Sequence, residues 1–433
     1  MEKEWSMLSK LKTNAAVEVL SKVNNLFPSI NLAVNIKAMF LVAMGLTSNL
    51  AYAKETNSTS GSQNFQLHGF LSQGLIDVDG SDFVNDDGEL SAELTEIGLN
   101  ASYKINNRFR LAGQVVYLDG GNRYAQGARV DYALLDWSAY SDDNWQANIY
   151  LGRFKNNHWL YSSSRDIPFA RPSIILPQSV YFDGFRDIAV GSDGIASKIS
   201  YSSDEYGDFD WQISYGTSPI SDEQTKNILS EYAQGTAEQD YDSQTSLYWR
   251  PAFSSWRFGM SLLEAGFTYD QSAQDFFYDA DFVFQFYTLN ALYEGELWEF
   301  SGEVYQQRFT IDGFYFPGFN LDNVGQGFYL QSRYKLTDKM TLLVRYEDFY
   351  LDKDDKDGKE LEESTGGQVP YYFGFHKDVT LGLNYDITSN FSARMEYHWV
   401  KGAGRLTPVV APNPQINNSE DWQMWAIQLM YWF

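Results

Sequence analysis

The sequence predicts an all-β protein, a transmembrane antiparallel β-barrel of 16 strands with short periplasmic turns and long external loops. Three observations support this fold class. Runs of roughly ten residues that are apolar at every second position recur from Phe65 to Phe433, as in strands with one apolar face. Short and long connections alternate between these runs. Aromatic residues make up 17% of the chain. This high content does not come from spanning helices, because no apolar run approaches the ~20 residues that such a helix needs.

Composition narrows the class of protein further. The 433 residues carry a formal charge of −25, with no Cys and four His. A strongly acidic chain argues against a nucleic-acid partner, because phosphate binding needs clustered Lys and Arg. Without Cys, neither a disulfide scaffold nor a thiolate metal site can form. We therefore expect no cofactor and no metal site.

The N-terminal region has the form of an export signal. Residues 38–46 are a short apolar run after Lys37, and Ala51-Tyr52-Ala53 fits a signal-peptidase site. We expect 1–53 to be a signal peptide cleaved after Ala53, and 54–64 to be a polar leader. The segment before the apolar run exceeds the length of a whole ordinary signal, so either the n-region is extended or the true start codon lies later. A short buried helix is the alternative.

The barrel is expected to span residues 65–433, and the runs can be followed in order. In the last one, Trp425, Ile427, Leu429, Tyr431 and Phe433 fall on one face. The sixteen runs are centred near residues 71, 99, 114, 135, 149, 196, 212, 247, 262, 287, 303, 329, 345, 380, 396 and 427.

The connections are short after every even-numbered run and long after every odd-numbered one. Outer-membrane barrels sort their connections in this way. Lipid cannot satisfy backbone N–H and C=O groups, so a sheet spans it only when it closes without edges. Aromatic girdles at both interfaces would account for the Trp and Tyr content. A soluble sandwich or propeller is the alternative, and it would need evenly spaced turns and more Leu, Ile and Val inside.

Over essentially its whole mature length, the chain resembles the Gram-negative bacterial porins, and three motifs carry this resemblance. They are the opening strand FQLHGF at 65–70, the LGR at 151–153, and the terminal Phe433 with alternating apolar residues before it. The resemblance implies an outer-membrane barrel, usually a trimer, whose third loop folds inward to narrow a pore. It also implies that Tyr431 and Phe433 belong to the assembly signal presented to the barrel-insertion machinery.

The third loop departs from the family pattern. Residues 155–187 lack the acidic, Gly-rich tip of general-diffusion porins, and three Pro favour an extended, stiff path. This indicates a divergent or substrate-selective branch. The expected constriction residues are Arg165, Asp166, Arg171, Asp183 and Arg186. This loop is the only external loop with a basic excess, whereas the other seven hold 23 acidic and 6 basic residues.

Charged residues at inward positions should form the pore wall, because Arg or Lys facing lipid costs ~2–4 kcal/mol near the midplane. The expected wall residues are Arg110, Lys198, Arg250, Arg394 and Glu396, with Lys104, Glu96, Arg257, Glu299, Glu303, Arg333, Arg345 and Glu347 on the same face. For most of them, the simplest role is to solvate a water-filled wall.

These features together predict a water-filled channel for passive diffusion of small hydrophilic solutes and ions, located in the outer membrane of a Gram-negative bacterium. The acidic charges on the external loops at the channel mouth are screened by salt over ~8 Å. The electric field inside the channel should therefore be dominated by Arg165, Arg171 and Arg186. Expected partners are outer-membrane lipid and lipopolysaccharide, the insertion machinery, the solutes, and two further copies of the chain. Residues 351–373 are acidic but lack the spacing of a calcium loop.

Two other functions remain open at this stage. A receptor or adhesin barrel without open conductance would use the long loops for binding. A barrel hydrolase would need a His beside a nucleophile, and only His68, His158, His376 and His398 exist; His158 precedes Ser162, Ser163 and Ser164. We expect no enzymatic activity.

Overall fold

The computed structural model describes residues 64–85, 90–230, 232–406 and 418–433. The predicted signal peptide, its cleavage site and all of the polar leader except Asn64 lie outside the described residues.

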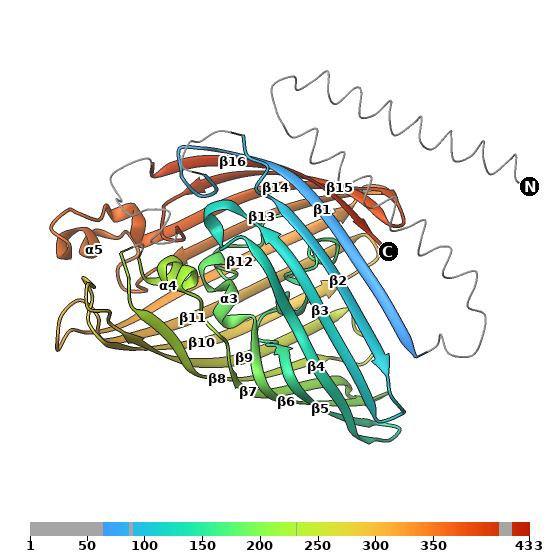
Figure 1. Cartoon of the computed structure of the whole chain (residues 1–433). Coiled ribbons are helices and arrows are strands. Elements are labelled where there is room, and N and C mark those ends of the chain that lie inside the picture. The colour runs from blue at the N-terminus through green and yellow to red at the C-terminus, as the bar shows by residue number, and fades with distance from the viewer. Residues whose placement is uncertain (1–63, 86–89, 231, 407–417) are drawn as a thin grey trace, which may run out of the picture. The chain divides into compact units, whose positions relative to one another are not determined.

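Sixteen strands form a closed antiparallel barrel in which every strand pairs with its sequence neighbours and β1 pairs with β16 (Figure 1). The strands are β1 (Phe65–Asp79), β2 (Thr95–Lys104), β3 (Phe109–Asp119), β4 (Gly127–Ser141), β5 (Trp145–Lys155), β6 (Gly191–Ser203), β7 (Gly207–Thr217), β8 (Thr236–Arg250), β9 (Trp256–Asp270), β10 (Ala280–Glu294), β11 (Trp298–Gly313), β12 (Asn320–Lys335), β13 (Met340–Tyr350), β14 (Phe375–Thr388), β15 (Phe391–Lys401) and β16 (Asp421–Trp432). Each predicted centre falls inside its strand, so the predicted fold class is confirmed.

The barrel closes between its first and last strands. β1 and β16 pair from Phe70 opposite Trp432 to Asp79 opposite Gln423. Beyond that register, Gly69 and Phe433 exchange backbone hydrogen bonds of 3.1 and 3.0 Å. The terminal residue therefore completes the ladder, and the sheet is left without an open edge.

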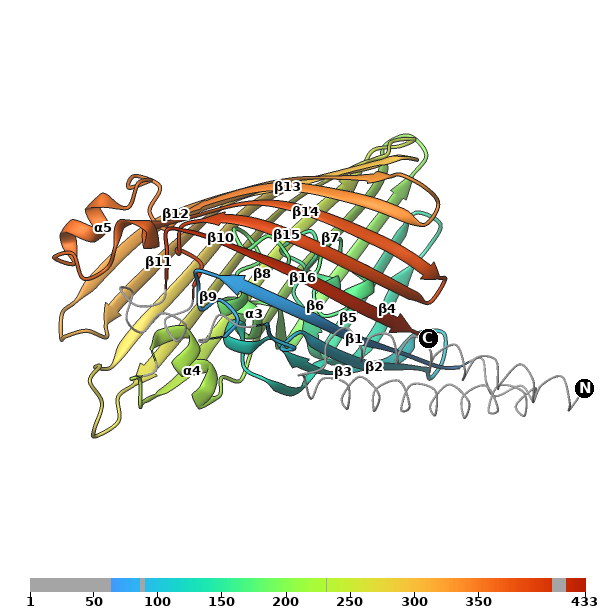
Figure 2. The same ribbon diagram turned by 90° about the horizontal axis from the view of Figure 1, so that it is seen from above.

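The connections alternate as predicted, from the two residues 389–390 between β14 and β15 to the 35-residue segment 156–190 between β5 and β6. Both views place α4 (Asp222–Leu229) and α5 (Lys359–Ser364) at the long-loop end, opposite the C-terminus (Figures 1 and 2). The remaining helical turns are η1 (Gly121–Arg123), η2 (Ser162–Ser164), η3 (Pro168–Ala170), η4 (Asp183–Phe185), α3 (Arg186–Ala189) and η5 (Tyr371–Gly374). Within the described residues, no helix combines the length and apolar character needed to cross a bilayer.

The outer face is apolar in its middle and aromatic at the short-turn end. Leu262, Leu289 and Val344 are about half exposed, as lipid-facing side chains of an isolated chain would be. At the short-turn ends of β5–β12, contacting rings form a row made of Trp145, Tyr201, Phe209, Trp249, Phe258, Trp256, Tyr293, Phe300, Trp298 and Tyr334. This arrangement matches an interfacial girdle.

Part of the interior is lined by aromatic side chains. The inward faces of β9–β12 carry an aromatic cluster that includes Phe282, Phe284 and Phe286, and it packs against Trp159 and Phe185 of the long segment 156–190. The expectation of a water-filled wall is therefore wrong over this part of the barrel. Alternation hid this feature, because β10 carries apolar or aromatic residues on both faces: Phe282, Phe284 and Phe286 on one, and Val283, Tyr287 and Leu289 on the other.

Candidate functional site: loop 3 inside the barrel

The segment 156–190, here called loop 3, folds into the barrel, and both views place its α3 between the walls (Figures 1 and 2). It leaves β5 along the inner face of β7–β9. Gln212 Nε2 donates to Lys155 O at 3.2 Å, Asn156 Nδ2 donates to Asp242, and Ser261 Oγ donates to His158 O. Its first residues are thus fixed by wall side chains.

Glu303 on β11 then anchors the two arms of the loop together. Its Oε2 accepts from Leu160 N at 2.9 Å, while its Oε1 accepts from the hydroxyls of Tyr181 and of Tyr329, the latter at 3.0 Å. A buried carboxylate with several donors is stable, because its hydrogen bonds compensate for lost hydration.

The opposite wall holds the loop's extended middle through its backbone. Glu396 accepts from Ile174 N at 2.6 Å and Ile175 N at 3.2 Å, and Arg394 Nη1 donates to Pro168 O at 2.9 Å. The exposed fractions of Arg394 and Glu396 are 6% and 2%. These two predicted wall residues therefore bind loop 3 and do not belong to the majority whose simplest role is to solvate a water-filled wall.

Two residues of β13 hold the same stretch of the loop from a third direction. Glu347 Oε2 accepts from Ser179 N at 2.7 Å. Arg345 Nη1 donates to Ser173 Oγ at 3.1 Å and to Ile175 O at 3.0 Å. Backbone groups of an irregular segment need partners when they are buried, and here the charged wall supplies them.

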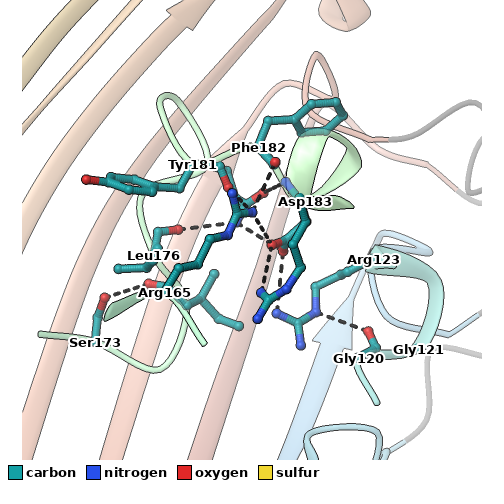
Figure 3. A network of polar contacts seen from close by, with 12 residues as sticks. Gly120, Gly121, Arg123, Arg165, Ser173, Leu176, Tyr181, Phe182 and Asp183 are labelled. Carbon is teal, nitrogen blue, oxygen red and sulfur yellow. Dashed lines mark hydrogen bonds and ion pairs between the residues drawn. The ribbon is translucent and has the colours of Figure 1, made fainter. Parts of the chain in front are cut away.

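The predicted constriction residues come together, but as buried ion pairs. Arg171 makes a two-pronged contact with Glu96 of β2, with both nitrogen–oxygen distances 2.7 Å. Figure 3 shows Arg165 and Arg123 approaching Asp183 from two directions, at 3.0 and 3.5 Å.

The same network extends to the start of the loop. Arg186 pairs with Asp166, and Lys155 lies 3.4 Å from Asp166 and 2.8 Å from Asp131.

These contacts join five cations to four carboxylates, all at least about nine-tenths buried at the side chain. Burial alone would raise the pKa of Asp166, but Arg186 and Lys155 beside it lower that pKa below its ordinary value. Burial opposes the charge of Arg171, yet the Glu96 carboxylate raises the pKa of Arg171. Both therefore stay ionised. The arginines, which were predicted to dominate the pore field, are only 1–5% exposed.

The other predicted wall residues lie toward the short-turn end and are more exposed. Lys198 is 3.6 Å from Asp210, and Arg250 is 2.7 Å from Glu294, with side-chain exposures of 39% and 36%. Arg110 is exposed as well. These three residues are not brought together with loop 3.

The histidines divide into one exposed and three buried side chains. His68 is exposed, whereas His158, His376 and His398 are 0–2% exposed. Neither ring nitrogen of His158 has a hydrogen-bond partner in the described part of the chain. Burial, with Arg165 nearby, lowers the pKa of His158 to about 3.

His398 differs because its Nδ1 lies 2.7 Å from Asp378 Oδ2. Asp378, Asp242 and Asp131 were not among the residues predicted from the sequence. The sequence did offer one sign of their role: each lies at an inward position with a polar residue two positions before or after it.

Loop 3 and the wall fill much of the barrel's middle. Each of the sixteen strands contributes at least one buried polar side chain that points inward. They are Ser72, Glu96, Gln114, Asp131, Asn148, Ser192, Gln212, Gln244, Ser261, Thr288, Glu303, Gln331, Arg345, Thr380, His398 and Gln428. A wide aqueous lumen would leave such side chains accessible. The geometry therefore favours a narrow passage.

The chain was compared with known families, curated proteins and solved structures. No family model and no curated protein matches the chain. Among solved structures, it is similar to the trimer form of OmpT, an outer membrane protein of Vibrio cholerae, with 14% identity, a TM-score of 0.53, and coverage of 85% of this chain and 99% of that one.

Two further structures are equally similar in fold. One is the outer membrane channel DcaP of Acinetobacter baumannii, with 12% identity, a TM-score of 0.53, and coverage of 85% of this chain and 97% of that one. The other is the anion-selective porin from Comamonas acidovorans, with 11% identity, a TM-score of 0.53, and coverage of 85% and 99%. The chain thus has a porin-like outer-membrane β-barrel fold.

Proposed function

We propose that the protein is an outer-membrane channel for passive diffusion of small hydrophilic solutes, and that loop 3 keeps its passage narrow. The observation that carries this proposal is the inward fold of loop 3, held by Glu96, Glu303, Glu347 and Glu396 of the barrel wall. A receptor that uses only its external loops has no need for such an internal anchorage. The similarity to a solved channel and to an anion-selective porin agrees with the proposal.

The selectivity of this channel should be weak. In loop 3, Arg171 lies 2.7 Å from Glu96, Arg165 lies 3.0 Å from Asp183, and Arg186 pairs with Asp166. Because these arginines are buried and neutralised, little of their field reaches a passing ion. Arg110 is exposed, and the Lys198 side chain is 39% exposed with its nearest carboxylate 3.6 Å away, so these two charges are left to act on solutes, whereas Arg250 pairs with Glu294 at 2.7 Å. We propose that Arg110 and Lys198, rather than Arg165, Arg171 and Arg186, set the ion preference.

The remaining expectations accompany this proposal. The protein would be exported by its N-terminal signal, inserted by the machinery that recognises Tyr431 and Phe433, and surrounded by lipid and lipopolysaccharide. A homotrimer is proposed from the trimer form of the OmpT structure. We propose no catalytic activity: Ser162 Oγ accepts from Trp159 N at 2.9 Å, and the ring of His158 is bonded to no hydroxyl in the described part of the chain.

The test is a reversal-potential measurement in planar bilayers under a salt gradient. Lys198→Ala should shift the potential toward cation preference, because it removes an exposed positive charge from the passage. The matched control is Arg308→Ala, which removes an arginine on the outer face that pairs with Asp322 at 2.7 Å. Equal shifts in both variants would contradict the proposed pore wall. Folded wild-type protein without any conductance would favour the receptor function instead.

A further inference from the structure

We propose that Glu347, His376 and Asp378 bind one divalent transition-metal cation, of which Zn²⁺ is the best fit, inside the barrel beside loop 3. The register of two neighbouring strands creates this group. Glu347 of β13 lies directly opposite Asp378 of β14, and His376 precedes Asp378 by two residues, so all three side chains share the inward face.

The distances and burial suit a metal ion. One ligand atom from each residue lies within 4.8 Å of the others, and no other such group of three occurs in the described part of the chain. Three atoms at these separations can surround one ion at the 2.0–2.2 Å bond lengths of zinc after small adjustments. The three residues are 0%, 2% and 3% exposed.

Each residue has one polar atom that makes no hydrogen bond in the described part of the chain. These atoms are Glu347 Oε1, His376 Nε2 and Asp378 Oδ1. Buried polar atoms of a native protein are nearly always satisfied. Of the three atoms, Glu347 Oε1 lies 3.3 Å from Arg345 Nε, whereas His376 Nε2 and Asp378 Oδ1 have neither a hydrogen bond nor an ion pair in the described part of the chain. A cation that accepts lone pairs from the cluster would satisfy these two atoms.

The second oxygen of each carboxylate is already held in place. Glu347 Oε2 accepts from Ser179 N at 2.7 Å, and Asp378 Oδ2 accepts from the Thr380 hydroxyl at 3.2 Å and contacts His398 Nδ1 at 2.7 Å. Metal-binding carboxylates are commonly oriented by such outer contacts, which leave the other oxygen for the metal. The arrangement is preorganised for a cation.

The local charge also favours a bound cation. Three carboxylates, those of Glu347, Asp378 and Glu396, surround the site, and Arg345 opposes them with its Nε 3.3 Å from Glu347 and its Nη2 3.9 Å from Asp378. Three carboxylates outnumber the basic groups Arg345 and His398, whose ring nitrogens lie 2.7 Å from Asp378 and 3.5 Å from Glu396, so the cluster holds excess negative charge that a cation offsets. One imidazole nitrogen and two carboxylate oxygens form a donor set that suits zinc better than calcium or magnesium.

The site would also stiffen loop 3. Glu347 binds Ser179, and Arg345 binds Ser173, so a metal on Glu347 fixes the wall groups that hold the loop. His376 is the second residue of β14, which follows the long connection 351–374. The site therefore lies near the long-loop end of the barrel.

The experiment measures Zn²⁺ bound to purified, refolded full-length barrel after dialysis, together with the shift of its unfolding temperature on addition of Zn²⁺. We expect about one Zn²⁺ per chain that EDTA removes, a higher unfolding temperature with Zn²⁺, and no similar shift with Mg²⁺ or Ca²⁺. His376→Ala should abolish the retained ion and the shift. His158→Ala, which removes another buried histidine with free ring nitrogens, is the matched control and should keep both.

Two results would overturn the proposal. One is a wild-type protein that retains no Zn²⁺, and the other is equal retention by wild type and His376→Ala, which would assign the metal to acidic external loops. If His376→Ala fails to fold, Glu347→Gln replaces it, because the amide keeps an oxygen for Ser179 N and loses the charge. Folding is checked by the heat-dependent shift of the barrel on a gel.

Discussion

Removing Arg171 should release loop 3 and destabilise the barrel. Arg171→Met leaves Glu96 only 1% exposed, with the 2.9 Å contact from Gln428 Nε2 as its remaining partner among the described residues. Breaking a buried ion pair by removing one partner costs about 3–5 kcal/mol, because the other charge stays desolvated. Arg171 also donates to Ser173 O and Arg165 O, so loop contacts are lost as well. The expected loss of unfolding free energy is therefore about 4 kcal/mol.

The paired variant separates this charge effect from packing. Glu96→Leu/Arg171→Met removes both charges together, and replacing a buried ion pair by apolar groups is often nearly neutral. We expect the double variant to recover most of the lost stability, with an interaction energy of about 3 kcal/mol in the double-mutant cycle. The assay is urea unfolding in lipid vesicles, followed by the fluorescence of the 12 Trp. A loss below about 1 kcal/mol for Arg171→Met, or additive losses in the cycle, would refute the reasoning.

Three further predictions concern assembly, pH and packing. Deleting Phe433 removes the ladder contact with Gly69, so unfolded precursor should accumulate in the periplasm; normal membrane levels on fractionation would contradict this. Between pH 6.5 and 3, His158 is protonated in the unfolded chain but stays neutral in the folded chain. The free energy of unfolding should therefore decrease as the pH is lowered, by up to about 1.4 kcal/mol per pH unit. His158→Leu should reduce that slope in unfolding titrations. Gly98→Ala places a Cβ 2.2 Å from the Phe70 ring and should cost about 1–3 kcal/mol, whereas Gly113→Ala, with its nearest neighbour at 3.5 Å, should cost less.

The strands could be predicted from the sequence because each is a local, two-residue pattern. Trp425, Ile427 and Leu429 alternate whatever the rest of the chain does, and the short turns follow the same local chemistry. Closure between β1 and β16 follows from the need to leave no edge in lipid. Residue type and alternation were therefore sufficient for the architecture.

The contents of the barrel could not be predicted in this way. The pairing of Arg171 with Glu96 joins residues 75 positions apart, and that of Glu396 with Ile174 joins residues 222 positions apart. Both depend on the path of loop 3, which has no repeating pattern. The triad of Glu347, His376 and Asp378 depends on the β13–β14 register across a long loop, and its spacing matches no metal motif.

Residues 351–373, in the acidic loop between β13 and β14, have local contacts that their charge alone did not predict. Sequence indicated their charge, and the structure adds that Asp355 Oδ2 caps α5 by accepting from Leu361 N at 2.9 Å. Lys359 pairs with Asp357, which lowers the pKa of that carboxyl. Part of the acidic density thus serves the local fold of the loop.

Whether loop 3 narrows an open channel can be measured as the single-channel conductance of the purified protein in planar bilayers, compared with a variant in which residues 160–185 are replaced by a short Gly-Ser linker. Barrel formation in both is verified by the heat-dependent gel shift. We expect small, discrete steps for the wild type and steps several-fold larger for the shortened loop, because the wall residues that now bind loop 3 would line open water. Equal conductance in the two proteins, or no steps from either folded barrel, would contradict this expectation.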